Sequence, residues 1–248
     1  MTADSSEYFY DSIADRFEGL DHPADLKRRL SIVFDECLAD TDLAGKRILD
    51  AGCGYGPFSS AASKRGAAVL SVDIGRRLVA RAMARAGSRG LVADACELAV
   101  RDESFDVVIS SEMLEHTDAP LRALEELGRV LRPHGLLVLT TPNRVWQGIV
   151  RAASALGLRP FHGLENFCAW SDLERACSAA GLDIVAHVGF HPWPFQLGFE
   201  RAARAVEHVF ARGHAGRFMV NQALVARKRA GARRYSYITE ASARSPGM

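Results

Sequence analysis

The feature that most constrains the fold of this chain is the alternation of short apolar segments with amphipathic ones. Five segments have the composition of buried strands: residues 46–51, 67–72, 91–93, 105–110 and 136–140. Helical patterns lie between them, at 57–64, at 76–86 and after Pro120, and two more strand patterns follow at 182–188 and 220–226. Strands that alternate with helices form a largely parallel sheet with helices on both faces. The sequence therefore predicts an α/β fold.

The residues at the helix ends give more specific predictions. Thr117 or Asp118 is expected to cap the helix that has Pro120 in its first turn. The apolar stripe of this helix is expected to comprise Leu121, Leu124, Leu127, Val130 and Leu131. A later helix is expected to begin with the capping box Ser171–Glu174 and to end at Gly181.

The chain is expected to divide into three parts. Residues 1–40 combine a polar lead with a helix that begins at Pro23, and they are predicted to form an N-terminal lid. Residues 41–228 are predicted to form the main domain, which carries an insertion at about 142–170. Residues 229–248 are basic and then small and polar, so we expect a disordered tail. A contact of this basic cluster with nucleic acid or lipid headgroups is the alternative.

The overall composition excludes several classes of protein. The 248 residues carry a formal net charge of +1, and nothing in that balance calls for nucleic acid or an anionic membrane as a partner. The chain has no apolar run long enough to cross a membrane, and its acidic N-terminus lacks the apolar core of a signal peptide. Its five cysteines form no CxxC pair and lack histidines at zinc spacing. We therefore expect free thiols in a cytoplasmic protein without a metal site.

A glycine-rich loop, DAGCGYG at Asp50–Gly56, follows the first strand pattern. Glycine lets a backbone approach a ligand closely, and ligands of open α/β sheets bind beyond the carboxyl ends of the strands. The dinucleotide fingerprint GxGxxG is not matched, because Gly56 comes two residues after Gly54 and Pro57 takes the place of the last glycine. Asp50 would repel a pyrophosphate but suits an ammonium group. These features favour S-adenosylmethionine over NAD as the cofactor.

Acidic residues end the next strand patterns at corresponding positions. Asp73 ends the second strand, where a carboxylate can accept both ribose hydroxyls of an adenosine. Asp94 ends the third strand and can meet the adenine amino group, with the backbone of Ala95 beside it. Ser111 and Glu112 follow the fourth strand on the same rim. Because all these positions lie at consecutive strand ends, we expect them to share one site.

The order and spacing of these segments resemble those of the class I S-adenosylmethionine-dependent methyltransferases. The resemblance rests on ILDAGCGYG, SVDIG, VADACELAVRDESFDVVISSEMLEHTDAP and LGRVLRPHGLLVLTTPN. It is strong over residues 45–145 and loose over 160–190, and it is nearest to the branch of quinone-biosynthesis and natural-product methyltransferases that act on small molecules. It implies a Rossmann-like, seven-stranded, mostly parallel sheet with helices on both faces and an antiparallel last strand.

The same resemblance implies a set of cofactor-binding residues. The methionine part would lie against Asp50, Gly52, Cys53, Gly54 and Gly56. The ribose and the adenine would lie against Asp73, Ile74, Asp94 and Ala95. Ser111 and Glu112 would border the methyl-transfer site, with His116 just beyond them.

Methyl transfer depends mainly on the alignment of donor and acceptor, which can supply about 7–11 kcal/mol. A hydroxyl acceptor also needs a general base, which adds about 10²–10⁴-fold. The candidate bases are His116, beyond the fourth strand, and His162 and Glu165, which lie in the insertion; His191 is a weaker candidate. For His116, a structural hydrogen bond that orients its loop is the alternative.

The acceptor site is expected to be apolar. Helical spacing relates Trp146, Ile149, Val150 and Leu156, and further aromatic residues cluster nearby in sequence. These side chains form either ordinary core or a cover over an aromatic or prenylated small molecule, with peripheral membrane contact as a further prediction. An aromatic hydroxyl is the favoured acceptor, and C- and N-methylation stay open. An NPPY-type signature is missing after the fourth strand, which argues against DNA or RNA as the acceptor.

Two other classes of function compete with this interpretation. A NAD-dependent oxidoreductase is disfavoured by Asp50 and by the missing fingerprint. A non-catalytic module that keeps the cofactor pocket for structure or regulation is compatible with the same residues. Methylation of a protein or a nucleic acid is a further alternative within the same family.

Overall fold

A seven-stranded sheet with the strand order β3-β2-β1-β4-β5-β7-β6 forms the centre of the computed structural model, which describes residues 9–157, 165–212 and 214–231. The strands are β1 (Arg47–Ala51), β2 (Ala68–Asp73), β3 (Arg89–Val92), β4 (Phe105–Ser111), β5 (Leu131–Pro142), β6 (Leu182–Phe190) and β7 (Asn221–Lys228). The first five strands pair in parallel, and β7 is antiparallel to both β5 and β6. The predicted α/β fold, with its antiparallel last strand, is confirmed.

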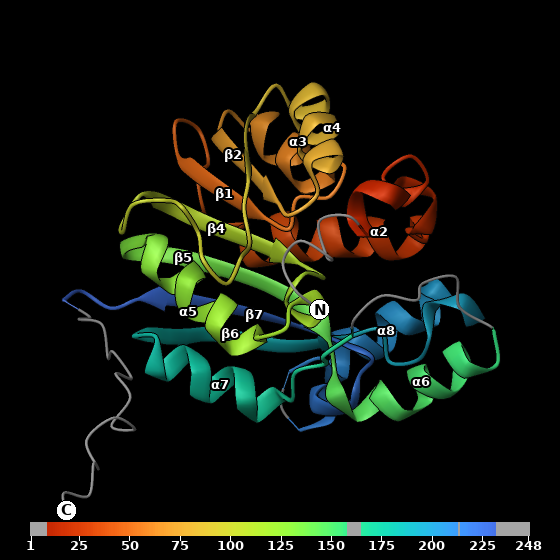
Figure 1. Cartoon of the computed structure of the whole chain (residues 1–248). Helices are drawn as coiled ribbons and strands as arrows, with labels where there is room; N and C mark the ends of the chain where they lie inside the picture. Colours follow the sequence, from red (N-terminus) through yellow and green to blue (C-terminus); the bar gives the residue numbers. More distant parts are fainter. Residues whose placement is uncertain (1–8, 158–164, 213, 232–248) are drawn as a thin grey trace, which may run out of the picture.

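Helices cover the sheet and one of its ends. They are α2 (Pro23–Ser31), α3 (Pro57–Ser63), α4 (Arg76–Ala86), α5 (Pro120–Val130), α6 (Gln147–Ala155), α7 (Trp170–Ala179) and α8 (Glu200–Phe210). Shorter helical turns are η1 (Phe17–Leu20), η2 (Ile32–Cys37), η3 (Leu114–His116), η4 (Arg144–Trp146), η5 (Phe195–Leu197) and η6 (Ala215–Phe218). Figure 1 shows α2, α6 and α8 gathered at the end of the sheet toward which β1 and β4 point. Across the described ranges, no helix combines the length and the apolarity needed to span a bilayer.

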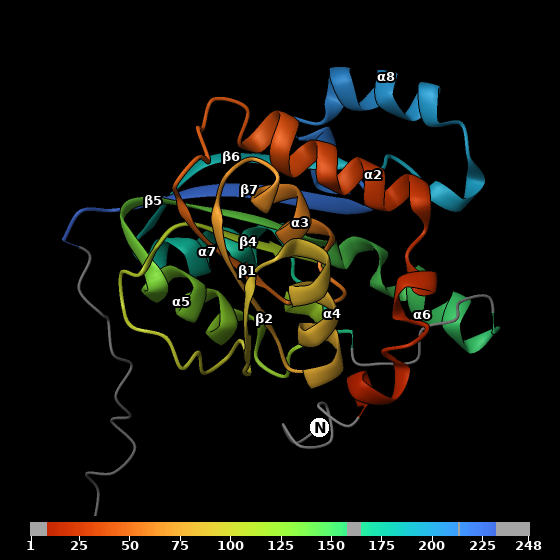
Figure 2. The same cartoon turned by 90° about the horizontal axis from the view of Figure 1, so that it is seen from above.

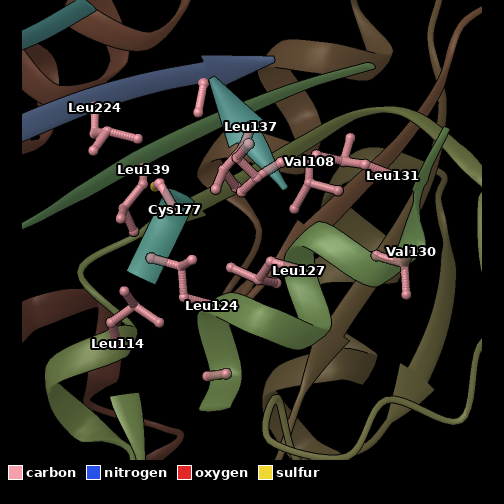
Figure 3. Packing of buried hydrophobic residues seen from close by; sticks show 14 of the residues in the cluster. Val108, Leu114, Leu124, Leu127, Val130, Leu131, Leu137, Leu139, Cys177 and Leu224 are labelled. Carbon is pink, nitrogen blue, oxygen red and sulfur yellow. The ribbon is translucent and has the colours of Figure 1, made fainter. Parts of the chain in front are cut away.

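One face of the sheet packs against α5 and α7. Leu124 and Leu127 of α5 and Cys177 of α7 are fully buried there against strand residues such as Leu137. Figure 3 shows these side chains pointing toward one another from the helices and the strands. Leu121 was expected in the same stripe, but this prediction is wrong, because the side chain lies on the outer side of α5 and is 45% exposed.

The opposite face packs against η2 and α3. Phe34 of η2 and Phe58 of α3 form a second core with Ile48 of β1 and Val107 of β4. Neighbouring residues of a strand point to opposite faces, so Ile48 belongs to this core, whereas Leu49 belongs to the first one. Burial on both faces explains why these strands have nearly continuous apolar sequences.

Both predicted helix caps are wrong. The residue that precedes α5 is Ala119, and no side chain caps the helix; the hydroxyl of Thr117 donates to the carbonyl of Leu114 in η3 instead (2.8 Å). Helix α7 begins at Trp170, one residue before the expected cap, and the carboxylate of Glu174 accepts a hydrogen bond from the Trp170 indole (2.9 Å). Competing local partners thus removed the hydroxyl and the carboxylate from their expected capping positions.

Strand β5 is longer than its apolar pattern indicated. It begins at Leu131, which was expected in the helix, and Leu131 pairs with Phe105 of β4. Leu131 is fully buried in the sheet core. Regular pairing resumes only at Leu136, which pairs with Val107, so the register shifts across Arg132–Gly135 and these residues form an irregular part of β5.

We predict that Leu127→Ala lowers the free energy of unfolding by about 2–5 kcal/mol, because it leaves a cavity in a close-packed core. Leu121→Ala, on the same helix, is the matched control and is expected to cost less than about 1 kcal/mol. Urea denaturation followed by circular dichroism measures both values. Equal losses in the two variants would contradict the packing of α5.

Candidate functional site

A cavity of about 660 Å³ opens at the carboxyl ends of the parallel strands. Eleven of the residues that the sequence predicts for the site line it: Gly52, Cys53, Gly54, Asp73, Ile74, Asp94, Ala95, Ser111, Glu112, His116 and Glu165. Asp50 and Gly56 do not line it. His162 lies outside the described residues. The fold thus brings together predicted positions that are far apart in sequence.

The glycine loop is shaped mostly by packing within the protein. Gly52 has a φ of 73°, and a Cβ atom on it would lie 2.3 Å from Cγ of Met113. Gly56 has a φ of 88°, and its Cβ atom would lie 2.6 Å from Cα of Ala82 in α4. Gly54 lines the cavity, as Gly52 does, and the nearest side chain to its Cβ position is Phe17, at 3.2 Å. Two glycines therefore allow close packing, and the third keeps the backbone open to the cavity.

Asp50 supports this loop from below. Its carboxylate accepts a hydrogen bond from the Ser59 hydroxyl (2.6 Å), and the Ser59 hydroxyl also contacts that of Ser71 (2.7 Å). Burial raises the pKa of Asp50 to about 6, against these hydrogen bonds. Asp50 is 1% exposed and does not line the cavity, and the direct ligand contact that the sequence indicated stays a prediction.

Asp73 fixes the loop relative to the end of β2. Its two carboxylate oxygens accept the backbone N–H groups of Gly54 and Gly75, each at 2.9 Å. Burial raises the pKa of Asp73, and these hydrogen bonds act in the opposite direction. A carboxylate can accept about four hydrogen bonds. Asp73 lines the cavity and therefore keeps acceptor capacity for hydroxyl groups of a ligand.

Asp94 lines the cavity just after the end of β3. Its carboxylate accepts the backbone N–H of Cys96 (2.8 Å), which fixes the turn after the strand. Ile74 and Ala95 line the cavity beside it. The part of the cavity that we call the glycine-loop half is lined by Gly52, Cys53, Gly54, Asp73, Ile74, Asp94 and Ala95.

The segment after β4 carries two buried carboxyl groups. Glu112 has a φ of 52°, a strained conformation for a residue with a side chain, and its Oε2 accepts from the Asn221 amide (3.0 Å). Burial, and next the charge of Glu115, raise the pKa of Glu112. Glu115 accepts from the Thr141 hydroxyl (2.9 Å), and burial raises its pKa to about 7. The cavity therefore holds carboxyl groups that resist ionisation.

Two of the predicted bases belong to the lining of this cavity. His116 and Glu165 both line it. Nε2 of His116 lies 3.9 Å from a carboxylate oxygen of Glu115, and its ring packs edge-on against that of Tyr10 at 6.4 Å. His191 lies apart from this lining, and its Nε2 is hydrogen-bonded to Asp25 (3.0 Å). The geometry thus separates His191 from the other candidates.

The N-terminal segment lies over the glycine-loop half. Tyr10 and Phe17 line the cavity, and the Asp15 carboxylate pairs with Arg77 and Arg81 of α4, each at 2.7 Å. Figure 2 shows this segment beside α4 and before α2. The division into a lid at 1–40 and a main domain stays a prediction, and residues 232–248 of the predicted tail lie outside the described ranges.

A buried ionic network in α2 was missed by the sequence analysis. Arg29 is 5% exposed and donates to Asp25 (2.8 Å) and Asp21 (2.7 Å), and the Tyr55 hydroxyl also donates to Asp21 (2.7 Å). All four residues line the cavity. The i,i+4 spacing of Asp25 and Arg29 was the available signal, but it is more typical of an exposed helix face.

Apolar side chains form the remaining wall, which we call the apolar half of the cavity. Its residues are Trp146, Ile149, Val150, Phe167 and Phe195. Leu156 was grouped with them by its helical spacing, but it is 74% exposed and does not line the cavity. In the ranges that the structure describes, no group of three or more His, Cys, Asp or Glu residues is arranged to hold a metal ion.

Relatives of known name match this chain. A family model described as a methyltransferase domain matches residues 49–139. A ubiquinone biosynthesis O-methyltransferase of Nitrosococcus oceani is 33% identical over 161 residues, which cover 60% of this chain and 68% of that protein. The protein of the same name from Idiomarina loihiensis is 36% identical over 164 residues, with coverage of 60% and 68%.

Solved structures share the fold. A magnesium protoporphyrin IX methyltransferase from Synechocystis, with bound SAH (S-adenosylhomocysteine), has a TM-score of 0.64 at 18% identity over 91% of this chain and 99% of that one. The cyclase SpnF has a TM-score of 0.66 at 21% identity over 93% and 98% of the two chains. At these identities the likeness shows the fold alone.

We predict that Glu115→Gln stabilises the protein at pH 8 but not at pH 4.5. A buried carboxyl whose pKa rises from 4.5 to about 7 on folding contributes stability below its unfolded pKa, and this contribution is lost as the pH rises through the folded pKa. Because glutamine does not ionise, the variant should gain up to about 3 kcal/mol over the natural protein across this window.

Urea denaturation at pH 4.5, 6 and 8 measures this difference. Glu125→Gln on the exposed side of α5 is the control, and its effect should stay within about 0.5 kcal/mol at every pH. A gain that is the same at pH 4.5 and pH 8 would show that Glu115 does not titrate in this window.

Proposed function

Because this chain belongs to the S-adenosylmethionine-dependent methyltransferases, we propose that it transfers the methyl group of this cofactor to a hydroxyl oxygen of an aromatic or prenylated small molecule. The observation that carries the proposal is that the glycine-loop half and the apolar half belong to one continuous cavity. A methyl donor and an apolar acceptor can meet only where two such sites are continuous.

The residues of the glycine-loop half fit the cofactor. Gly54 keeps the backbone open, and the Asp73 carboxylate has one backbone donor on each oxygen with further acceptor capacity toward the cavity. We propose that Gly52, Cys53 and Gly54 contact the methionine part, and that Ser111 and Glu112 border the transferred methyl group. The ribose and the adenine would be held by Asp73, Ile74, Asp94 and Ala95. Asp50 and Gly56 would act by supporting the loop.

When bound, S-adenosylmethionine supplies a methyl group that its sulfonium has already activated. The protein must therefore mainly align the acceptor oxygen and exclude water, and alignment can supply about 7–11 kcal/mol. The apolar half would hold the acceptor beside Ser111 and Glu112, and the N-terminal segment would close the cavity from the other side. Tyr10 and Phe17 are the side chains of that segment placed to exclude water.

A hydroxyl acceptor must lose a proton during transfer. We propose His116 or Glu165 as the group that takes it, because both line the cavity. Glu115, 3.9 Å from Nε2 of His116, would orient the ring. His162 stays a candidate from the sequence.

The apolar half is the basis for the proposed class of acceptor. The relatives named ubiquinone biosynthesis O-methyltransferase agree with an oxygen acceptor on an apolar molecule. Helix α6 of the insertion buries none of its side chains completely, and Val145 and Ile149 beside and within it are 55% and 57% exposed. Peripheral membrane contact through this helix stays a prediction. We also propose a reducing, cytoplasmic setting, because the five cysteines are free thiols.

We predict that S-adenosylhomocysteine raises the melting temperature of the protein. At about 100 times its Kd it should stabilise the fold by about 2.7 kcal/mol, or roughly 5–10 °C for a domain of this size. Asp73→Ala should abolish the shift, whereas Asp183→Ala, an exposed residue of β6 paired with Arg229, should keep it. NAD should give no shift. If S-adenosylhomocysteine does not change the melting temperature of the natural protein, the proposed function is contradicted.

We predict that replacing the general base lowers kcat by about 10²–10⁴-fold and leaves the S-adenosylhomocysteine shift unchanged. His116→Ala, Glu165→Gln and His162→Ala are assayed separately for release of S-adenosylhomocysteine with a panel of phenols. His191→Ala is the comparison, since His191 does not line the cavity and its ring is hydrogen-bonded to Asp25, and it should lower stability more than turnover. Full rates in the first three variants would exclude all three as the base.

A further inference from the structure

The N-terminal segment, residues 9–20, and helix α4 carry rows of opposite charge that face each other. Acidic residues of the segment and arginines of α4 both recur at intervals of three or four positions. They are Asp11, Asp15 and Glu18 in the segment and Arg77, Arg81 and Arg85 in α4. Because residues four apart on a helix share one face, the arginines line one side of α4.

The two rows are joined by ion pairs in regular order. Nη2 of Arg77 donates to both carboxylate oxygens of Asp15 (2.7 Å each), and Nη2 of Arg81 donates to one of them (2.7 Å). In the last turn of α4, Nη1 of Arg85 donates to Glu18 (3.0 Å). We call these ion pairs the latch, because they hold the segment along α4 from its first turn to its last.

Asp11 adds a helix cap to this attachment. The N-cap of α4 is Gly75, which has no side chain to cap the helix, and Oδ1 of Asp11 accepts the backbone N–H of Arg77 instead (2.9 Å). The first N–H groups of a helix have no partner within it, so a carboxylate there is stabilising through both its hydrogen bond and its charge. Figure 2 shows the segment beside this end of α4.

Few apolar contacts hold the same segment. Of residues 9–20, all of which the structure describes, only Ile13 and Ala14 are buried. The side chain of Asp15 is 67% exposed, and those of Arg77 and Arg81 are 48% and 38% exposed. Segments with little buried apolar surface open more easily than the core, and exposed ion pairs are weakened by salt. The attachment of the segment therefore depends on ionic strength.

The segment covers the backbone groups that hold Asp73. A ring carbon of Phe17 lies 3.2 Å from the Cβ position of Gly54, and Cβ of Tyr10 lies 3.2 Å from the Cβ position of Gly75. The N–H groups of these two glycines are the ones that the Asp73 carboxylate accepts. Both aromatic side chains also line the cavity. A molecule held by Asp73 would therefore meet them on its way out.

We propose that Asp15 is a positioning residue: its ion pairs with α4 latch the N-terminal segment over the bound cofactor, so that opening of the latch sets the rate of cofactor exchange. This inference rests on the proposed function and deepens it. Because the latch consists of exposed ion pairs, exchange is slow at low ionic strength and faster at high ionic strength.

The test measures the release of S-adenosylhomocysteine. Bound labelled ligand is chased with an excess of unlabelled ligand at about 20 mM and at about 500 mM NaCl, where the Debye length is about 20 Å and about 4 Å. The natural protein should release the ligand about 3- to 30-fold faster at the higher salt concentration. Asp15→Arg should release it fast at both concentrations, because the variant replaces attraction to the arginines by repulsion.

Two variants control for effects unrelated to the latch. Asp15→Arg combined with Arg77→Asp and Arg81→Asp reverses every charge in these pairs and should restore slow, salt-dependent release. Glu125→Arg makes the same change of charge on α5, where Glu125 pairs with Arg122 (3.2 Å), and it should release the ligand like the natural protein. If Asp15→Arg releases the ligand as slowly as the natural protein, or if the combined variant stays fast, the inference is overturned.

Amide hydrogen exchange separates this inference from the proposed function, since it needs no ligand. In the unliganded protein, the amides of residues 9–20 should exchange faster in Asp15→Arg and at high salt, whereas those of α7 should not change. If S-adenosylhomocysteine does not bind the natural protein, the proposed function fails, and this pattern of exchange would still support the latch. Unchanged exchange of residues 9–20 in Asp15→Arg would overturn it.

Discussion

Burial of the central strands on both faces is the constraint on which the rest of this structure depends. Leu49 and Ile48 of β1 point into opposite cores, and both are fully buried. With α5 and α7 on one face and η2 and α3 on the other, the faces of the sheet are not available to a ligand. The open ends of the strands remain, and the loops there carry the polar side chains that a site requires.

The cavity at these ends contains several buried carboxyl groups whose charged form is unfavourable in the folded protein. Burial raises the pKa of Asp73, Glu112 and Glu115, and Glu112 also holds a strained backbone conformation. Arg29 is a buried cation beside them, and it donates to Asp21, to Asp25 and to the Ser111 hydroxyl. Residues with shifted pKa values and strained backbones that share a cavity are typical of functional sites. There the arrangement serves ligand binding, although it lowers the stability of the fold.

Fold and function are separate conclusions for this protein. The same architecture is found in a methyltransferase and in a cyclase at similar TM-scores, so the sheet order does not specify the reaction. Membership in the methyltransferase family rests on sequence relatives. The acceptor is a question about the apolar half, whose residues Trp146, Ile149 and Val150 follow β5 and whose Phe195 follows β6.

The sequence by itself determined the sheet and the glycine loop, because strand periodicity, Gly52, Gly54 and the acidic residue at the end of β2 are local features whose consequences follow from chain geometry. Only the tertiary structure decided the directions of side chains that depend on packing between elements far apart along the chain. Asp50 turned toward Ser59 because α3 folds over it, and Asn221 donates to Glu112 because β7 inserts between β5 and β6. Contacts between residues far apart in sequence leave no periodic pattern, so they could not be predicted from one sequence.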